Sequence, residues 1–209
     1  MSRLFIAVSF ILCYLIFDMK LSKIAKIQSG YHSRARVESH EDGSHFLLQA
    51  RDIDGENLIY QLDSLIRFYP DLSRTDGALK KNDILFMARG NRNYSVLLEK
   101  IPDPTLAAAY FFIIRISSEK LLPAYLCWYL NQAPVERYLV RHSGRGVHMP
   151  VIRRSVLEKT DIPLPNMEIQ KKIVELENLR RIEGELINRL AEKRKQLITA
   201  SCLALIRES

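Results

Sequence analysis

The chain from residue 166 to its end at residue 209 contains no proline and a single glycine, and its apolar side chains recur at helical spacing. Intervals of three, four and seven residues place such side chains along one face of an α-helix. These positions are Ile169, Ile173, Leu176, Leu179, Leu186, Leu190 and Leu197. The pattern therefore predicts one amphipathic helix of about 35 to 40 residues, ~55 Å long at 1.5 Å per residue, within residues 166–209.

A helix of this length cannot bury its apolar face against one small domain. It requires a second helix, from the same chain or from a partner, and coiled-coil pairing is the natural arrangement. The apolar seam is interrupted at Glu183 and Lys193, where a continuous seam would carry apolar side chains. We expect this helix to make the contacts with a second copy and with partner subunits.

Residues 162–165 read IPLP and cannot form regular helix, because alternate prolines remove backbone donors and favour extended neighbours. They separate the helix from a mixed α/β body at residues 19–165. Apolar and β-branched runs predict strands at 46–51, 83–88 and 110–116. Pro123 suits a first helical turn, so we predict a helix from residue 122 that ends at Ala133-Pro134, and a second helix over 135–140. The expected fold class is α+β: one mixed α/β domain followed by a long C-terminal coiled-coil helix.

The N-terminal residues 4–17 form an uncharged apolar run behind Arg3. The run is shorter than the ~20 residues of a membrane span. No small-residue cleavage site follows it, as a signal peptide would require. We favour a translation start at Met19, with residues 1–18 as an apolar extension outside the domain. A buried helix or strand at the start of the fold, and an exported or membrane-bound protein, stay open as alternatives.

Sequence signatures of common active sites are missing. The chain has no P-loop, no dinucleotide-binding glycine motif, no zinc-protease motif and no serine-hydrolase elbow. Its five histidines form no spaced ligand set, and Cys13, Cys127 and Cys202 are too far apart for a zinc or disulfide framework. We therefore predict a chain without catalytic residues, metal site or cofactor of its own, in a reduced, cytoplasmic setting. A small enzyme with an unrecognised site is the alternative.

The net charge of the chain is +7, and most of the excess lies in the central body. A positive balance favours polyanionic partners. The loop after the strand at 83–88 concentrates side chains that read base edges or bind phosphate. These candidates are Arg89, Gly90, Asn91, Arg92, Asn93 and Tyr94, with Gly90 permitting a tight turn or a close backbone approach. An ordinary solvated hairpin turn explains the same residues equally well.

Two further basic segments are candidates for DNA contact. Residues 137–154 contain five arginines and two histidines but no carboxylate, and Arg145 and His148 are its candidate contacts. A third patch near the turn at residues 30–31 adds Arg34 and Arg51, with Arg36 between them. Uncompensated positive charge is the footprint of phosphate contact, and a solvated basic face has the same composition. We expect the aromatic residues of apolar runs, such as Tyr110, in the core.

Five segments in this order resemble the specificity subunits of type I restriction–modification systems. They are residues 20–31 (KLSKIAKIQSGY), 49–53 (QARDI), 79–90 (LKKNDILFMARG), 125–131 (YLCWYLN) and 162–174 (IPLPNMEIQKKIV). The third resembles the family's GDILF…RG strand and loop, with Asn82 where the family often has glycine. The last, which opens the long helix, is the most specific of the five.

The resemblance implies a non-catalytic subunit that recognises double-stranded DNA and recruits a methyltransferase subunit. That partner would supply S-adenosylmethionine and adenine N6 chemistry. Whether a restriction subunit, with ATP and Mg, also joins stays open. Members of the family have two target recognition domains, each followed by a helix, and the two helices pair antiparallel. This chain carries one of each, so it looks like a half-subunit that forms a homodimer on a palindromic split target. The alternative is a degenerate half-subunit that pairs with another specificity chain without reading DNA.

Overall fold

The structure is a computed structural model that describes residues 17–33, 36–54, 59–71, 73, 75–90, 92–142 and 151–208. It divides into two compact units, residues 1–170 and residues 171–209. Most of the apolar N-terminal run lies outside the described residues. Among the helices of the described ranges, none combines the length and the hydropathy that a membrane span requires.

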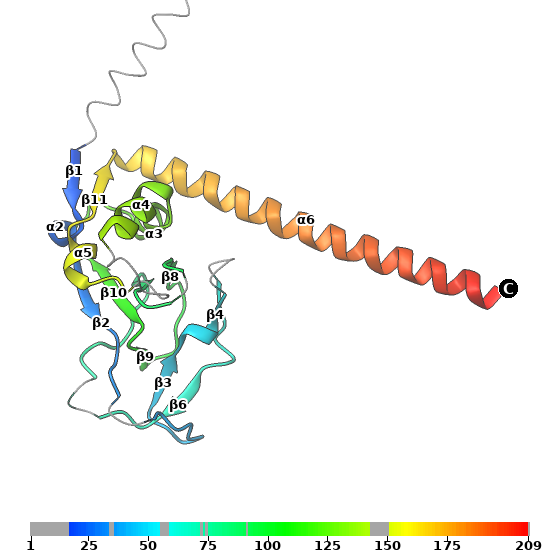
Figure 1. The fold of residues 1–209 in the computed structure, drawn as a ribbon, viewed down its shortest axis with the longest axis horizontal. Coiled ribbons are helices and arrows are strands. Elements are labelled where there is room, and N and C mark those ends of the chain that lie inside the picture. The colour runs from blue at the N-terminus through cyan, green and yellow to red at the C-terminus, as the bar shows by residue number, and fades with distance from the viewer. Residues whose placement is uncertain are drawn as a thin grey trace, which may run out of the picture. The chain divides into compact units, whose positions relative to one another are not determined.

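The strongest strand signal in the sequence lies inside the main sheet (Figure 1). β10 (Phe111–Ile116) is rich in β-branched and aromatic residues, which favour strands. It pairs antiparallel with β2 (Ala25–Ser29) on one side and with β7 (Ile84–Met87) on the other. β8 (Ser95–Leu97) pairs with β7, so the strand order is β2-β10-β7-β8. Every residue of β7 is buried, as its apolar run predicts.

A second sheet has the strand order β6-β3-β9. β3 (His45–Leu48) pairs antiparallel with β6 (Ile66–Phe68) and parallel with β9 (Thr105–Ala107). The strand predicted at 46–51 therefore ends early, and its last residues belong to a 3-10 turn at Ala50–Asp52. That turn leads into a short hairpin whose strands are β4 (Ile53–Asp54) and β5 (Ile59–Tyr60).

The two faces of the second sheet belong to different apolar clusters. Successive residues of a strand point to opposite faces. Leu48 and Ala107 therefore join the core of the main sheet, whereas Leu47 and Leu106 pack with Phe68. The alternation along β3 and β9 therefore joins these two apolar clusters through the second sheet.

Within the described ranges, the body also contains four short helices: α2 (Leu21–Ile24), α3 (Pro123–Leu130), α4 (Ala133–His142) and α5 (Arg154–Glu158). α3 has its proline in the first turn, as predicted, where a missing N–H costs nothing. The second predicted helix is longer than expected. Pro134 lies in the first turn of α4 rather than between two helices.

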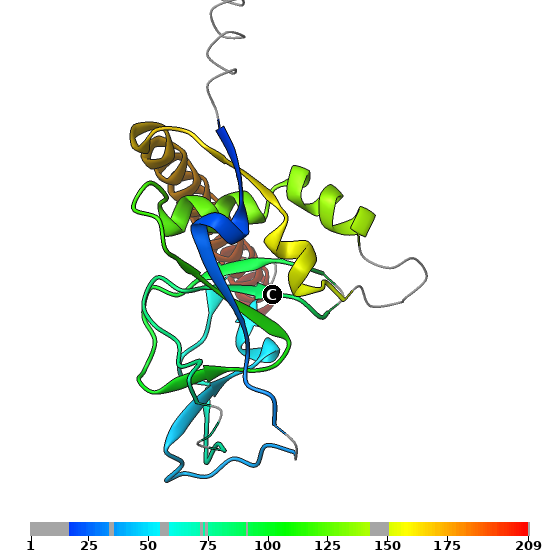
Figure 2. The same cartoon turned by 90° about the vertical axis from the view of Figure 1, so that its left-hand side faces the viewer.

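The body is closed by a two-stranded sheet of its first and last strands. β1 (Phe17–Lys20) pairs antiparallel with β11 (Asp161–Leu164), and Figure 2 shows the two strands side by side. An ion pair between Lys20 Nζ and Asp161 Oδ1, 2.6 Å apart, joins their ends. The residues IPLP are extended, as predicted. β1 begins two residues before Met19, so the structure includes Phe17 and Asp18 in the folded body.

The predicted C-terminal helix is α6 (Met167–Glu208), which has 42 residues and a length of about 63 Å at 1.5 Å per residue. Asn166 caps it, because its Oδ1 accepts the N–H of Ile169 at 3.0 Å. Gln170 is fully buried. Its Oε1 accepts the N–H of Leu122 at 2.9 Å, and its Nε2 donates to the carbonyl oxygens of Lys120 and Pro165, both at 2.8 Å. Gln170 therefore attaches the first turn of α6 to the body.

Candidate nucleic-acid interface

The loop that carries most of the predicted DNA contacts joins β7 to β8 and is held by backbone hydrogen bonds on two sides. The N–H of Met87 donates to the carbonyl of Tyr94 at 2.8 Å, which closes the hairpin. Ala88 donates its N–H to Tyr110 and accepts the N–H of Ile152, at 2.8 and 2.9 Å. Arg89 forms an isolated β-bridge with Val151. The start of the loop is thus fixed between two segments that lie far away in the sequence.

Two hollows of the body surface meet at Arg89. The larger has a volume of about 500 Å³ and the smaller about 310 Å³, and both are lined by Arg89 and Ala109. Arg36 and Arg51 line the larger hollow, and Arg153 and Arg154 line the smaller one. We call these five residues the arginine surface. No carboxylate is among the described residues that line either hollow.

Most of the arginine surface is free of compensating charge. Within the described ranges, the side chains of Arg36, Arg89 and Arg153 form no ion pair. Arg154 pairs with Glu158 at 2.7 Å along its own helix. The Arg51 Nε lies 3.8 Å from Asp52. Uncompensated guanidinium groups around a hollow favour phosphate and other anions.

Besides its ion pair with Arg51, Asp52 shapes the rim of the larger hollow. Its side chain is 2% exposed, and its carboxylate accepts the N–H of Gln49 at 2.7 Å and the hydroxyl of Ser64 at 3.2 Å. These bonds fix the turn that carries Gln49 and Arg51 to the larger hollow. The segment QARDI, which carries part of the resemblance, is therefore a positioning element for this rim.

The predicted contacts of the β7–β8 loop have different positions in the structure. Arg89 and Arg92 are exposed, and Gly90 is half-buried. The Asn93 side chain donates from Nδ2 to the carbonyl of Met87 at 2.8 Å, so it stabilises the turn. An added Cβ at Gly90 would lie 3.5 Å from its nearest neighbour, the Met87 Cγ, which is an ordinary contact. The fold therefore gives no steric reason for a glycine at residue 90.

The prediction that Tyr94 contacts DNA is wrong. Its side chain is 7% exposed and belongs to the apolar cluster that includes Met87, Val96 and Phe111. Burial raises the pKa of its hydroxyl, and the negative charge of Asp54 adds to that shift. The tyrosine is thus a core residue that closes the hairpin. Asn91, Arg34, Arg145 and His148 lie outside the described residues.

The sequence analysis also expected one residue that lines the larger hollow to lie in the core. Tyr110 is 52% exposed and lines the larger hollow, whereas its neighbour Phe111 is fully buried. β10 begins at Phe111, so Tyr110 lies just before the strand and escapes its burial. Burial changes from Tyr110 to Phe111, and an apolar run in the sequence does not reveal such a change.

The turn before β7 positions the hairpin from its other end. Asn82 has a φ of 70°, the left-handed region that only glycine and, less readily, asparagine adopt without difficulty. This explains a glycine or an asparagine at the position where the family often has glycine. Asp83 is buried and binds Arg115 of β10 through two hydrogen bonds, at 2.7 and 2.5 Å.

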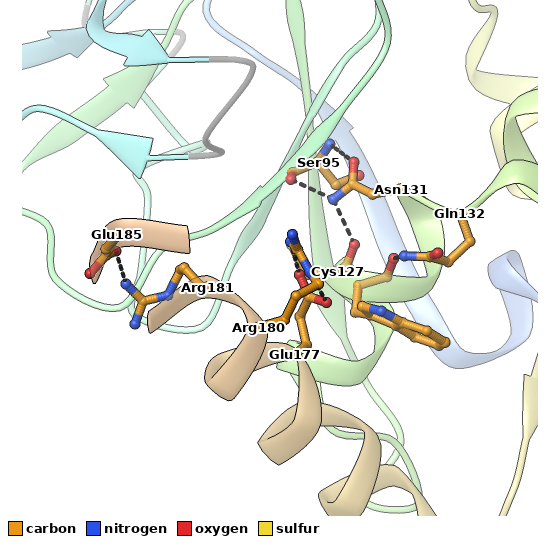
Figure 3. A network of polar contacts seen from close by, with 9 residues as sticks. Ser95, Cys127, Asn131, Gln132, Glu177, Arg180, Arg181 and Glu185 are labelled. Atoms are coloured by element: carbon orange, nitrogen blue, oxygen red, sulfur yellow. Dashed lines mark hydrogen bonds and ion pairs between the residues drawn. The ribbon is translucent and has the colours of Figure 1, made fainter. Parts of the chain in front are cut away.

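Asn131, in the segment YLCWYLN, connects α3 to the edge of the main sheet (Figure 3). Its Oδ1 accepts the N–H of Ser95 at 2.7 Å, and its Nδ2 donates to the carbonyl oxygens of Ser95 and Cys127 at 2.9 and 3.0 Å. The Asn131 amide thus bonds both backbone groups of Ser95 in β8, as a neighbouring strand would. It fixes the hairpin that carries Arg89 against the helix behind it.

The predicted partner face of α6 is exposed. Leu176, Leu179, Leu186, Leu190 and Leu197 are each more than half exposed, whereas Ile169 is 42% exposed and Ile173 half-buried. The ion pairs of Arg180 with Glu177 and of Arg181 with Glu185, both 2.5 Å, run along the helix itself (Figure 3). Exposed leucines at coiled-coil spacing mark a face for another helix. Among the described residues, no group of three or more His, Cys, Asp or Glu side chains is arranged to hold a metal ion.

Residues 73–193, more than half of the chain, match the type I restriction modification DNA specificity domain. The chain belongs to this family. Domains of the family recognise DNA and are not catalysts, in agreement with the predicted class of protein. Three of the five motif segments lie inside the match, and the segments at 20–31 and 49–53 lie before it.

Solved structures show the same fold in type I specificity subunits. The HsdS subunit from Thermoanaerobacter tengcongensis has a TM-score of 0.60 and 17% identity, over 83% of this chain and 39% of that chain. A chain from a structure that describes complex assembly and conformational transition of the type I R-M system gives 0.61 and 19%, over 87% and 42%. The type I S subunit from M. genitalium gives 0.52 and 15%, over 79% and 39%.

The specificity-domain chain thus spans about two fifths of the length of these relatives. No curated protein sequence matches it. The expected fold class, a mixed α/β domain followed by a long C-terminal helix, is confirmed by the structure and by these relatives.

Proposed function

We propose that this chain is the DNA-reading half of a type I specificity subunit, acting as a homodimer on a split palindromic target. The observation that supports this function best is the arginine surface, which groups five guanidinium groups around two hollows without a carboxylate in their lining. In a domain of the DNA specificity family, such a surface suits the phosphate backbone and the edges of guanine.

Arg89 is the residue on which the two hollows converge, and it is the first candidate for a base or phosphate contact. It is exposed, and its backbone is fixed by the bridge to Val151. Arg92 follows it on the same loop. Because this backbone is already fixed, only the side chain has to be ordered when Arg89 binds DNA. Arg36, Arg51, Arg153 and Arg154 then extend the positive surface along the DNA backbone.

The homodimer is supported by the long helix, whose exposed leucines at coiled-coil spacing require a second helix to cover them. Two-fold symmetry would present identical domains to two identical half-sites, so the target would be palindromic with a gap set by α6. A methyltransferase subunit is the partner that we expect on this assembly. It would hold S-adenosylmethionine, and a restriction subunit, where one joins, would bring ATP and Mg. For this role we expect a cytoplasmic protein.

A genome-wide map of adenine methylation tests the proposal in cells that carry the partner methyltransferase. The expected result is that deletion of the gene for this chain abolishes methylation at one split palindromic motif. Arg89→Ala should weaken methylation or relax one base of the motif. Lys81→Ala is the charge-matched control, because Lys81 lies at the opposite end of β7 in the hairpin. This control should keep the wild-type map.

The remaining outcomes contradict separate parts of the proposal. An unchanged map after deletion, with the protein expressed and the methyltransferase active, would mean that the chain does not direct methylation. Loss of an asymmetric split motif would keep the DNA-reading role but replace the homodimer by pairing with a different specificity chain.

A further inference from the structure

Between Leu176 and Leu197, the seam of α6 contains two charged residues that form no ion pair with the described residues of the helix. Counting heptads from Leu176 as position a, Leu179 is d, Glu183 is a, Leu186 is d, Leu190 is a, Lys193 is d and Leu197 is a. Glu183 is exposed and, within the described ranges, forms no ion pair. Among the described residues, the Lys193 ammonium donates only to Gln196 Oε1, at 3.3 Å. The intrahelical ion pairs of α6, in contrast, involve positions b, c, e and f.

We propose that α6 self-associates in a single antiparallel register in which Glu183 of each copy meets Lys193 of the other. This inference rests on the homodimer proposed above and specifies its geometry. In this register, residues whose numbers add up to 376 face each other, and the two-fold axis passes through Asn188. Leu179 then faces Leu197 of the second copy, and Leu186 faces Leu190. Each of these layers joins an a position to a d position, as antiparallel packing requires.

Other arrangements of the two helices bury the charges without partners. In a parallel pair, Glu183 would face Glu183 and Lys193 would face Lys193, and like charges in a seam repel. An antiparallel pair shifted by one heptad in either direction would place Glu183 opposite Ala200 or Leu186 and Lys193 opposite Leu190 or Leu176. A buried charge opposite an apolar side chain is strongly unfavourable. Among these registers, only the one centred on Asn188 pairs both charges. In this register the layers from Leu176 to Ala200 cover about 36 Å of seam.

Charge reversal in the full chain tests this register by sedimentation equilibrium. Glu183→Lys places like charges against Lys193 at both ends of the seam, and Lys193→Glu does the same with carboxylates. Each single variant should weaken self-association by about tenfold or more. The double variant Glu183→Lys/Lys193→Glu should restore it. An equimolar mixture of the two single variants should form heterodimers, since every seam charge then meets its opposite.

The heterodimer measurement also shows that both single variants are folded. The register is overturned if the chain is a dimer whose affinity is unaffected by single reversals, because a parallel or shifted pairing predicts that result. It is equally overturned if the double variant stays as weak as the single ones. In both cases the homodimer of the proposed function stands. A chain that stays monomeric at every concentration overturns the register together with that homodimer, and the methylation map then decides the DNA-reading role separately.

Discussion

Replacing Asp83 with asparagine tests the contact that fixes the base of the β7–β8 hairpin. The Asp83 side chain is 2% exposed and the Arg115 side chain 33% exposed. The carboxylate accepts hydrogen bonds from Arg115 Nε at 2.7 Å, Arg115 Nη2 at 2.5 Å and the Lys80 N–H at 2.8 Å. Removing one partner of a buried ion pair costs about 3–5 kcal/mol because the other charge is left uncompensated. Water reaches part of Arg115, so we expect a loss of about 2–3 kcal/mol in the free energy of unfolding.

Urea unfolding followed by circular dichroism measures this loss. With a slope of about 2 kcal/mol per molar urea, the midpoint of Asp83→Asn should fall by about 1–1.5 M. Asp76→Asn is the control, because Asp76 is an exposed residue of a turn, and its midpoint should stay within about 0.3 M of the wild type. Equal midpoints for the two variants would refute the reasoning that the Asp83–Arg115 pair holds β7 against β10.

Three further predictions concern the surface and the core. If Arg89 binds a phosphate, Arg89→Ala should make the plot of log K against log salt for duplex DNA binding by the full chain shallower by about 0.9. A loss of affinity confined to the cognate sequence would indicate a base contact. An unchanged slope and affinity would remove Arg89 from the interface. Gly30→Ala should destabilise the chain by about 1–3 kcal/mol in urea unfolding, because the added Cβ would collide with the Ala108 carbonyl oxygen. Gly90→Ala, where the added Cβ makes an ordinary contact, should change stability by less than about 0.5 kcal/mol. Equal losses for the two variants would contradict the packing argument. Burial raises the pKa of the Cys127 thiol from 9.0 to about 12. The contribution of the thiol to stability is therefore complete below pH 9 and is lost as the pH rises toward 12. Between pH 8 and 10.5 the free energy of unfolding of the wild type should fall by about 2 kcal/mol more than that of Cys127→Ala, and parallel pH profiles would show that the thiol ionises freely in the folded protein.

Local patterns predicted the elements whose signal lies within a few neighbouring residues. The β-branched run of β10, the helical spacing of α6 and the proline at the start of α3 each depend on the chain's own neighbours. The glycine-to-asparagine difference at residue 82 also has a local explanation, because the left-handed region favours glycine, asparagine and aspartate.

Assignments that depend on tertiary contacts were wrong or incomplete. Tyr94 looked like a loop residue because it follows Arg92 and Asn93, but its ring enters the core beneath the hairpin. Tyr110 looked like a core residue because it precedes Phe111, but it stands outside the strand and reaches the larger hollow. Both tyrosines lie one residue before a strand, β8 and β10 respectively. Their different burial depends on the segments that pack around them, which a composition window of several residues does not contain.

The arginine surface is a property of the fold rather than of any one segment. Arg89 was singled out from its own loop, whereas Arg36, Arg153 and Arg154 each lie in a different part of the chain from Arg51. They converge because Ala88 and Arg89 are bonded to residues 110 and 151–152. The buried contacts of Tyr94, Asn93 and Asp83 hold the hairpin that presents Arg89, so substitutions there should lower DNA affinity only as far as they unfold the hairpin. Substitutions of Arg36, Arg89 and Arg153, which form no ion pair within the described ranges, should lower affinity with little loss of stability. Measuring both quantities for each variant therefore separates the residues that carry the surface from those that contact the nucleic acid.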